Sequence, residues 1–137
     1  MNQTNDDFLP AGSYSLLADF RYELRCFQHF SELAAKAEGL SPQQHQALLS
    51  IHGAEDGMLS IGGLAERLLI KPHSASGLVD RLVAQGLVRR AEGKDRRRVN
   101  LLLTATARKK LTRLSRAHLA ELARIRPLLA RLIETTG

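Results

Sequence analysis

The chain has 137 residues, of which 44% are hydrophobic and 25% are charged. This size and composition predict one globular domain with a single core, and they exclude an intrinsically disordered chain. No apolar run approaches the ~20 residues that a membrane-spanning helix needs. The chain has no Trp and only 4% aromatic residues, which argues against a protein that stacks single-stranded nucleic acid on aromatic rings.

Charge is distributed unevenly along the chain, whose formal net charge is +6. Residues 1–56 carry eight acidic and three basic side chains, whereas residues 57–137 carry six acidic and seventeen basic ones. The strongly basic second half indicates a surface that binds a polyanion. The alternative interpretation is a solvated basic face without a partner.

The first thirteen residues, MNQTNDDFLPAGS, are expected to form a flexible polar tail. They lack the basic region and the apolar run that are typical of a secretory signal. The single cysteine, Cys26, excludes an intrachain disulfide and suits the reducing cytoplasm.

Two helices are predicted in the first half of the chain. Apolar residues recur at helical spacing between positions 14 and 37, and Gly39 favours a helix end. Ser41, Pro42 and Gln44 then combine three signals of a helix start. They predict a second helix that ends near Gly53.

Residues 60–85 predict two short helices joined by a tight turn, after a turn at 54–59. Ser60 can cap a helix that ends near Leu69, and Pro72 opens a helix that runs to about Gln85. This arrangement is a helix-turn-helix. Glycines 62 and 63 are poor helix formers, so either backbones approach closely there or the first turn is loose.

The pattern after Gly86 is typical of a β-hairpin. Residues 87–90 read as one strand and residues 92–95 as a charged turn. The packed side of the second strand is expected to consist of Val99, Leu101 and Leu103.

Two helices complete the chain, one capped by Thr104 and ending near Arg124, and one starting near Pro127. The order of all these elements predicts a mainly α fold with a small β-hairpin wing. The fold class is therefore a winged helix-turn-helix flanked by additional helices, which the resemblance described below identifies as dimerisation helices.

The wing carries a cluster of cations that can bind DNA phosphates. Its candidate DNA-binding residues are Arg89, Lys94, Asp95, Arg96, Arg97 and Arg98. Arg97 is expected to reach the minor groove, and Asp95 to fix the loop by accepting hydrogen bonds from a neighbouring arginine. A merely solvated turn is the alternative.

The second helix of the pair is expected to present its N-terminal end to bases and phosphates. Its candidate DNA-binding residues are Lys71, His73, Ser74, Ser76, Gly77 and Arg81. Ordinary capping by Ser74 and Ser76 is the alternative, and Arg81 could instead pair with Asp80 or with another acid.

Residues 60–104 resemble the DNA-binding core of the MarR (multiple antibiotic resistance regulator) family. The resemblance rests on LAERL at 64–68, LVDRL at 78–82, GLV at 86–88, and DRR at 95–97 followed by Leu103-Thr104. It extends over about residues 14–137, and residues 39–53 are similar to the second helix of the family.

The resemblance implies one MarR-like domain at 14–137. It would consist of a winged helix at 41–104 and dimerisation helices at 14–38 and 105–137. The implied function is sequence-specific transcriptional regulation, as a repressor, by a homodimer on a pseudo-palindromic operator in double-stranded DNA. Such a protein would be bacterial and cytoplasmic, and bound to the nucleoid when on DNA.

In the family a small molecule, often a phenol, typically releases the repressor. We expect an effector pocket lined by Phe20, Leu24, Phe27, Leu48 and Leu49.

Two alternatives to a ligand-released repressor stay open. The first is a peroxide sensor that uses Cys26, with Arg25 and His29 activating the thiol, although a buried mid-helix thiol is commoner. The second is a winged-helix module that binds protein or RNA.

No pattern predicts a metal, a cofactor or an enzyme. The five histidines have no close metal-ligand spacing. The sequence also lacks a Gly-rich phosphate loop, a nucleophile elbow and a paired-carboxylate arrangement.

Overall fold

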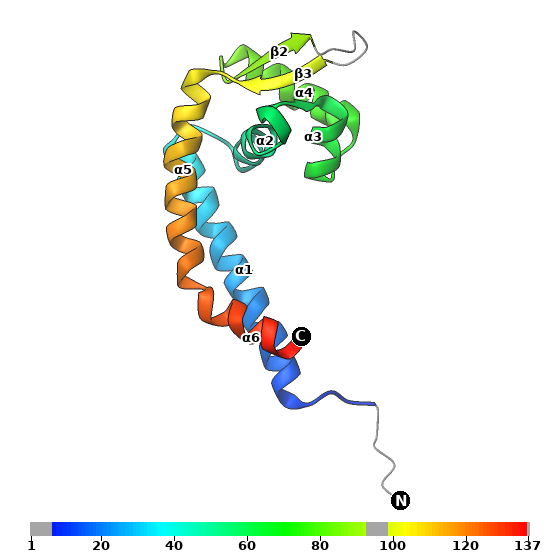
Figure 1. Ribbon diagram of the computed structural model, residues 1–137, viewed down its shortest axis with the longest axis vertical. Coiled ribbons are helices and arrows are strands. Elements are labelled where there is room, and N and C mark those ends of the chain that lie inside the picture. Colours follow the sequence, from blue (N-terminus) through cyan, green and yellow to red (C-terminus); the bar gives the residue numbers. More distant parts are fainter. Residues whose placement is uncertain (1–6, 93–98, 137) are drawn as a thin grey trace, which may run out of the picture. The chain divides into compact units, whose positions relative to one another are not determined.

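The computed structural model describes residues 7–92 and 99–136, and within them it is mainly helical with one small sheet (Figure 1). The predicted fold class is confirmed. The elements in chain order are α1 (Ala11–Ala37), α2 (Pro42–His52), the 3₁₀ turn η1 (Glu55–Gly57), β1 (Leu59–Ser60), α3 (Ile61–Leu68), α4 (Pro72–Ala84), β2 (Val88–Glu92), β3 (Val99–Leu103), α5 (Ala105–Arg124) and α6 (Arg126–Thr136).

The chain forms two compact units. We call residues 32–116 the winged-helix unit, and residues 1–31 with 117–137 the helical unit; α1 and α5 contribute to both. The winged-helix unit holds fifteen basic and eight acidic side chains, a net charge of +7, whereas the helical unit holds five basic and six acidic ones, a net charge of −1. The excess of positive charge therefore belongs to the winged-helix unit.

Helix α2 begins at the predicted capping box. Ser41 Oγ accepts a hydrogen bond from the Gln44 backbone N–H, and Gln44 Oε1 accepts one from the Ser41 backbone N–H, each at 3.1 Å. The same glutamine donates from Nε2 to Gln85 Oε1 at 3.0 Å. Gln44 thus takes part in both hydrogen bonds of the capping box and connects the start of α2 to the end of α4.

Apolar side chains of α1, α2, α3, α4, β2, β3 and α5 form the core of the winged-helix unit. Its largest fully buried apolar members are Leu48, Ile51, Leu64, Leu78, Leu82, Leu101 and Val79. Ser60 caps α3 by accepting from the Gly63 N–H at 3.0 Å. A Cβ at Gly63 would lie 2.7 Å from Leu59 Cδ1, so Gly63 is the place where elements approach closely, and Gly62 is open.

The sheet has three antiparallel strands in the order β1-β3-β2. The hairpin is confirmed, but Leu59, predicted as the last residue of a turn, and the cap residue Ser60 also form a short strand that pairs Leu59 with Leu101. Two residues are too short to show the alternation that identifies a strand from sequence. Val99 was expected on the packed side but is 43% exposed, because it pairs with Glu92 at the far end of the hairpin from Leu103.

Thr104 joins the wing to α5. Its hydroxyl donates to the Gly86 carbonyl at 2.7 Å and accepts from the Ala107 N–H at 3.2 Å. Its backbone N–H donates to the Leu87 carbonyl at 3.1 Å. The predicted cap of α5 therefore also closes the base of the hairpin.

Ion pairs and one aromatic cluster connect the helices of the helical unit. Arg124 binds Glu23 at 2.8 Å and Glu121 at 2.9 Å, and these hydrogen bonds raise the pKa of Arg124. Arg131 of α6 binds Asp19 of α1 at 3.2 Å, and α6 lies beside the N-terminal part of α1 (Figure 1).

The aromatic cluster surrounds His118. Phe27 and Phe30 contact the His118 ring edge-on, with ring centroids 5.5 and 5.3 Å away, and Ser31 Oγ lies 2.8 Å from its Nε2. Within residues 7–92 and 99–136, no helix is both long and apolar enough to cross a membrane.

An ion pair within the winged-helix unit gives a pH-dependent prediction. Arg113 donates two hydrogen bonds to the Glu38 carboxylate, at 2.7 and 2.8 Å, and these lower the pKa of Glu38 below its usual value. A carboxyl with a lowered pKa stabilises the fold above its unfolded-state pKa and loses this effect as pH falls through the folded-state pKa. We expect Glu38→Gln to lower the urea midpoint slightly at pH 7 and to match the wild type near pH 3.

The matched control for this measurement is Glu32→Gln, which alters an exposed acid of α1, the helix that ends just before Glu38. We expect its urea midpoint to follow the wild type at both pH values. A gap between Glu38→Gln and the wild type that stays constant from pH 7 to pH 3 would contradict the assignment.

Candidate nucleic-acid interface

The predicted DNA-binding residues of α4 lie along its first turns. Lys71 occupies the N-cap position without a side-chain cap, and Pro72 starts the helix. His73 and Ser74 are exposed, whereas Ser76 and Gly77 are half-buried. Ser74 therefore lies inside the first turn and is not the cap, and the first turn contains no acid. The N-terminal end of α4 keeps its positive potential available for an anion.

Arg81 and Gly77 lie together on α4. A Cβ at Gly77 would be 3.7 Å from Arg81 Nη1, so the guanidinium lies back along the helix toward its N-terminal end. In the part of the chain that the structure describes, Asp80 accepts a hydrogen bond from Arg90 at 2.5 Å and not from Arg81. Arg81, which belongs to the last turn of α4, thus places its charge beside the middle of the helix.

The Asp80–Arg90 pair connects α4 to β2. Both side chains are well exposed, at 69% and 41%, so the pair contributes little to stability but fixes the first strand of the hairpin against α4. The neighbouring Arg89 is exposed. The wing candidates Lys94, Asp95, Arg96, Arg97 and Arg98 lie outside the described residues.

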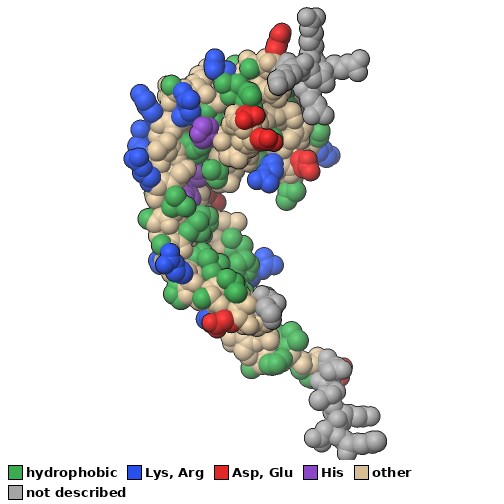
Figure 2. All heavy atoms as spheres, viewed as in Figure 1, with side chains coloured by type: hydrophobic (Ala, Val, Ile, Leu, Met, Phe, Trp, Pro, Cys, Tyr) green, Lys and Arg blue, Asp and Glu red, His purple; other side chains and the backbone are tan. Residues whose placement is uncertain are grey.

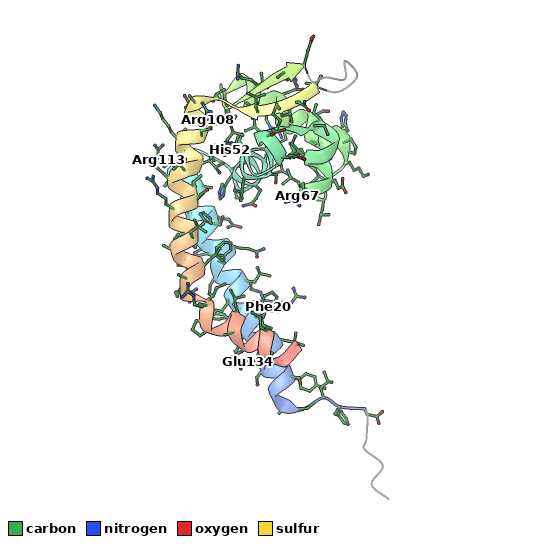
Figure 3. All side chains as sticks on the ribbon, in the orientation of Figure 1. Phe20, His52, Arg67, Arg108, Arg113 and Glu134 are labelled. Atoms are coloured by element: carbon green, nitrogen blue, oxygen red, sulfur yellow. The ribbon has the colours of Figure 1, made fainter. Side chains whose placement is uncertain are left out.

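The structure also contains a basic groove that the sequence analysis did not single out. It lies along α5 in the winged-helix unit, has a volume of about 390 Å³, and is lined by Ala105, Arg108, Lys109, Thr112, Arg113 and Arg116. Arg108 and Arg113 project from the first turns of α5 (Figure 3). The signal in the sequence was a helix start with several cations and no acid in its first turn, where cations oppose the helix dipole.

The five residues expected around an effector divide between the units. Phe20 is exposed, and Leu24 and Phe27 are half-buried in the helical unit. Leu48 is fully buried in the core of the winged-helix unit, and Leu49 is 43% exposed. An effector pocket lined by them stays a prediction.

Cys26 is half-buried on α1 and lies beside Tyr22. A side-chain hydrogen bond with Cys26 raises the pKa of Tyr22, and the neighbouring Glu23 adds to this effect. Cys26 is thus in contact with Tyr22, one turn earlier on α1. In the described part of the chain, no group of three or more His, Cys, Asp or Glu residues could hold a metal ion.

Residues 38–98 match the sequence model of the MarR family. The chain is also similar to the HTH-type transcriptional repressor YetL of Bacillus subtilis, with 26% identity over 118 residues, covering 85% of this chain and 71% of YetL.

Two solved structures illustrate the likeness of the fold. The first is AbsC, a MarR family transcriptional regulator from Streptomyces coelicolor, with a TM-score of 0.67, 20% identity, and coverage of 91% of this chain and 83% of AbsC. The second is MepR, a transcription regulator of the Staphylococcus aureus multidrug efflux pump MepA, with a TM-score of 0.73, 17% identity, and coverage of 90% and 98%. Together with the helix-turn-helix and hairpin described above, these findings show that the chain has the fold of MarR family transcriptional regulators and resembles that family in sequence over residues 38–98.

Proposed function

We propose that this regulator represses transcription by binding a pseudo-palindromic operator in double-stranded DNA through α4 and the β2–β3 hairpin. The observation that carries this proposal is the division of charge, with +7 on the winged-helix unit and −1 on the helical unit. DNA binding driven by phosphate neutralisation needs such a concentrated positive surface. This activity would take place on the chromosome in the bacterial cytoplasm.

In the proposed complex the N-terminal end of α4 enters the major groove. Lys71 and the free backbone amides of the first turn bind phosphates, and His73 and Ser74 reach base edges. Arg81, folded toward Gly77, binds a phosphate of the same strand. Small side chains at Ser76 and Gly77 allow the backbone of α4 to approach the DNA closely.

The hairpin would bind the flanking minor groove. Arg97 inserts into the groove, where a narrow width strengthens the negative potential. Asp95 orients the loop, and Arg89 binds the adjacent backbone. The Asp80–Arg90 pair keeps β2 at a fixed position on α4, so major-groove and minor-groove contacts form together.

The test of DNA binding is titration of the full chain with a duplex selected from a random library. We expect log Kd to rise linearly with log salt concentration. Arg81→Ala and Arg97→Ala should each weaken binding about tenfold or more, as expected for a charge-assisted contact worth about 1–3 kcal/mol. Lys36→Ala removes an equal charge from the last turn of α1 in the same unit, outside the proposed interface, and should change Kd less than threefold. Binding without salt dependence would refute the proposal.

We propose that the functional form is a homodimer assembled through the helical unit. Among the described residues of this unit only two hydrophobic side chains, Leu16 and Leu128, are buried. Its large exposed hydrophobic side chains are Phe8, Leu9, Tyr14, Leu17, Phe20, Tyr22, Leu119, Leu122, Leu129 and Ile133, and Figure 2 shows hydrophobic side chains along this unit. This much exposed apolar surface on a small unit is typical of a protein–protein interface.

Sedimentation velocity tests the dimer. We expect the wild type to sediment with about twice the 15.2 kDa mass of one chain. Glu replacements at Leu119 and Ile133, which are 67% and 71% exposed, should yield monomers because they place charge in the interface. Met58→Glu, a control in the winged-helix unit, should remain dimeric, and a monomeric wild type at micromolar concentration would contradict the proposal.

We propose further that a small molecule, phenolic in chemistry, releases the repressor from DNA. The resemblance to the MarR family supports release by a ligand, and the contact between Cys26 and Tyr22 keeps oxidation of the thiol as the second candidate. A panel of substituted phenols and a peroxide, added to the protein–DNA complex, separates the two. A phenol should release wild type and Cys26→Ser equally, whereas release by peroxide of the wild type alone would identify Cys26 as the sensor.

A further inference from the structure

The turn between α3 and α4 contains a strained and exposed leucine. Leu69 has φ 56° and ψ 42°, in the left-handed region. Its side chain is 92% exposed, which makes it the most exposed large hydrophobic side chain of the described residues. Both properties are unfavourable for a leucine, so the position calls for a physical explanation.

The left-handed conformation follows from the way in which α3 ends. The Leu69 N–H donates to the Glu66 carbonyl at 3.2 Å, and the Ile70 N–H donates to the Ala65 carbonyl at 3.0 Å. This pair of hydrogen bonds is the Schellman arrangement, in which Gly is preferred because a Cβ is strained there. Asn is the usual second choice, since its side chain tolerates the left-handed region.

Packing does not explain the leucine. A side chain that is 92% exposed buries almost no apolar area in the folded chain, so it gains nothing from the hydrophobic effect. Ile70, the next residue, is half-buried and occupies the position from which an apolar contact usually accompanies this type of helix end. Stability alone would therefore favour Gly at position 69.

The surroundings of Leu69 indicate what the side chain contacts. Leu69 lies three residues before Pro72, at the end of α4 that is proposed to enter the major groove. Arg67 and Lys71, two residues before and after it, are both exposed, and Arg67 projects from the end of α3 (Figure 3). An apolar group between two cations matches the DNA backbone, where a deoxyribose lies between two phosphates.

We propose that Leu69 packs against a deoxyribose of the DNA backbone while Arg67 and Lys71 bind the flanking phosphates. This inference rests on the DNA-binding function proposed above. Strain retained at an exposed position is a recurrent property of functional sites, and here it holds an apolar side chain out from the turn. Because every nucleotide carries the same sugar, the contact adds affinity without adding sequence preference.

The experiment measures binding of the full chain to a 30-base-pair duplex of random sequence, together with thermal unfolding. Leu69→Gly removes the side chain and the strain, so we expect a higher unfolding midpoint and binding weakened about five- to tenfold. Leu69→Asn should lose affinity to the same extent. The slope of log Kd against log salt should stay that of the wild type, because no phosphate contact is lost.

Three further variants complete the design. Arg67→Gln and Lys71→Gln should each reduce the salt slope by about one. Met58→Asn, which alters an exposed apolar residue away from the turn, should bind like the wild type.

Two results would overturn the inference. One is unchanged binding by Leu69→Gly together with its raised midpoint, and the other is a lowered midpoint, which would make Leu69 a folding residue. Failure of the wild type to bind any duplex would instead refute the proposed function itself, so the two failures are distinguishable.

Discussion

Strand β3 is the constraint on which the winged-helix unit depends. It is the central strand of the sheet, with β1 on one side and β2 on the other. Leu101 pairs with Leu59, which precedes α3, and with Arg90, which follows α4. Its side chain is fully buried. The two ends of the helix-turn-helix are thereby attached to one five-residue strand, and Thr104 continues this attachment into α5. The position of α4 relative to the hairpin is set by this strand together with the Asp80–Arg90 pair.

The two units are stabilised in different ways. The winged-helix unit has a continuous apolar core. Among its described residues, the helical unit buries two apolar side chains, and exposed ion pairs connect α1, α5 and α6. The net charge follows the same division. A basic surface and an apolar, nearly neutral one are thus carried by separate parts of one short chain, as expected where one part binds DNA and the other binds a second copy.

Most of the fold could be predicted from the sequence, because the helix signals are local. The capping box at Ser41, the cap at Ser60, Pro72 and the Leu103-Thr104 strand end each act within a few residues, and all are found where predicted. Strand β1 could not be predicted, because its partner lies about forty residues later and pairing over such a distance leaves no periodicity in two residues. The exposure of Val99 likewise depends on how far the helices cover the hairpin.

The candidate site was predictable by residue type but not by geometry. The sequence indicates which residues of α4 and the hairpin are cationic or small, and α4 presents them along its first turns. The sequence could not show whether Arg81 pairs with Asp80. The two residues are adjacent in sequence, but Asp80 binds Arg90 of β2. The left-handed conformation of Leu69 could not be predicted from the sequence either. Leucine disfavours this backbone conformation, but the hydrogen bonds that end α3 impose it.

The ion pairs of the helical unit have a consequence for how ionic strength acts on this protein. Arg124 and Arg131 are about half exposed, and the Debye length falls from ~10 Å at 0.1 M salt to ~3 Å at 1 M. Added salt therefore weakens the attachment of α6 to α1 within one unit while it screens the basic surface of the other. A rise in ionic strength therefore acts on both units, on the α1–α6 ion pair of one and on the basic surface of the other.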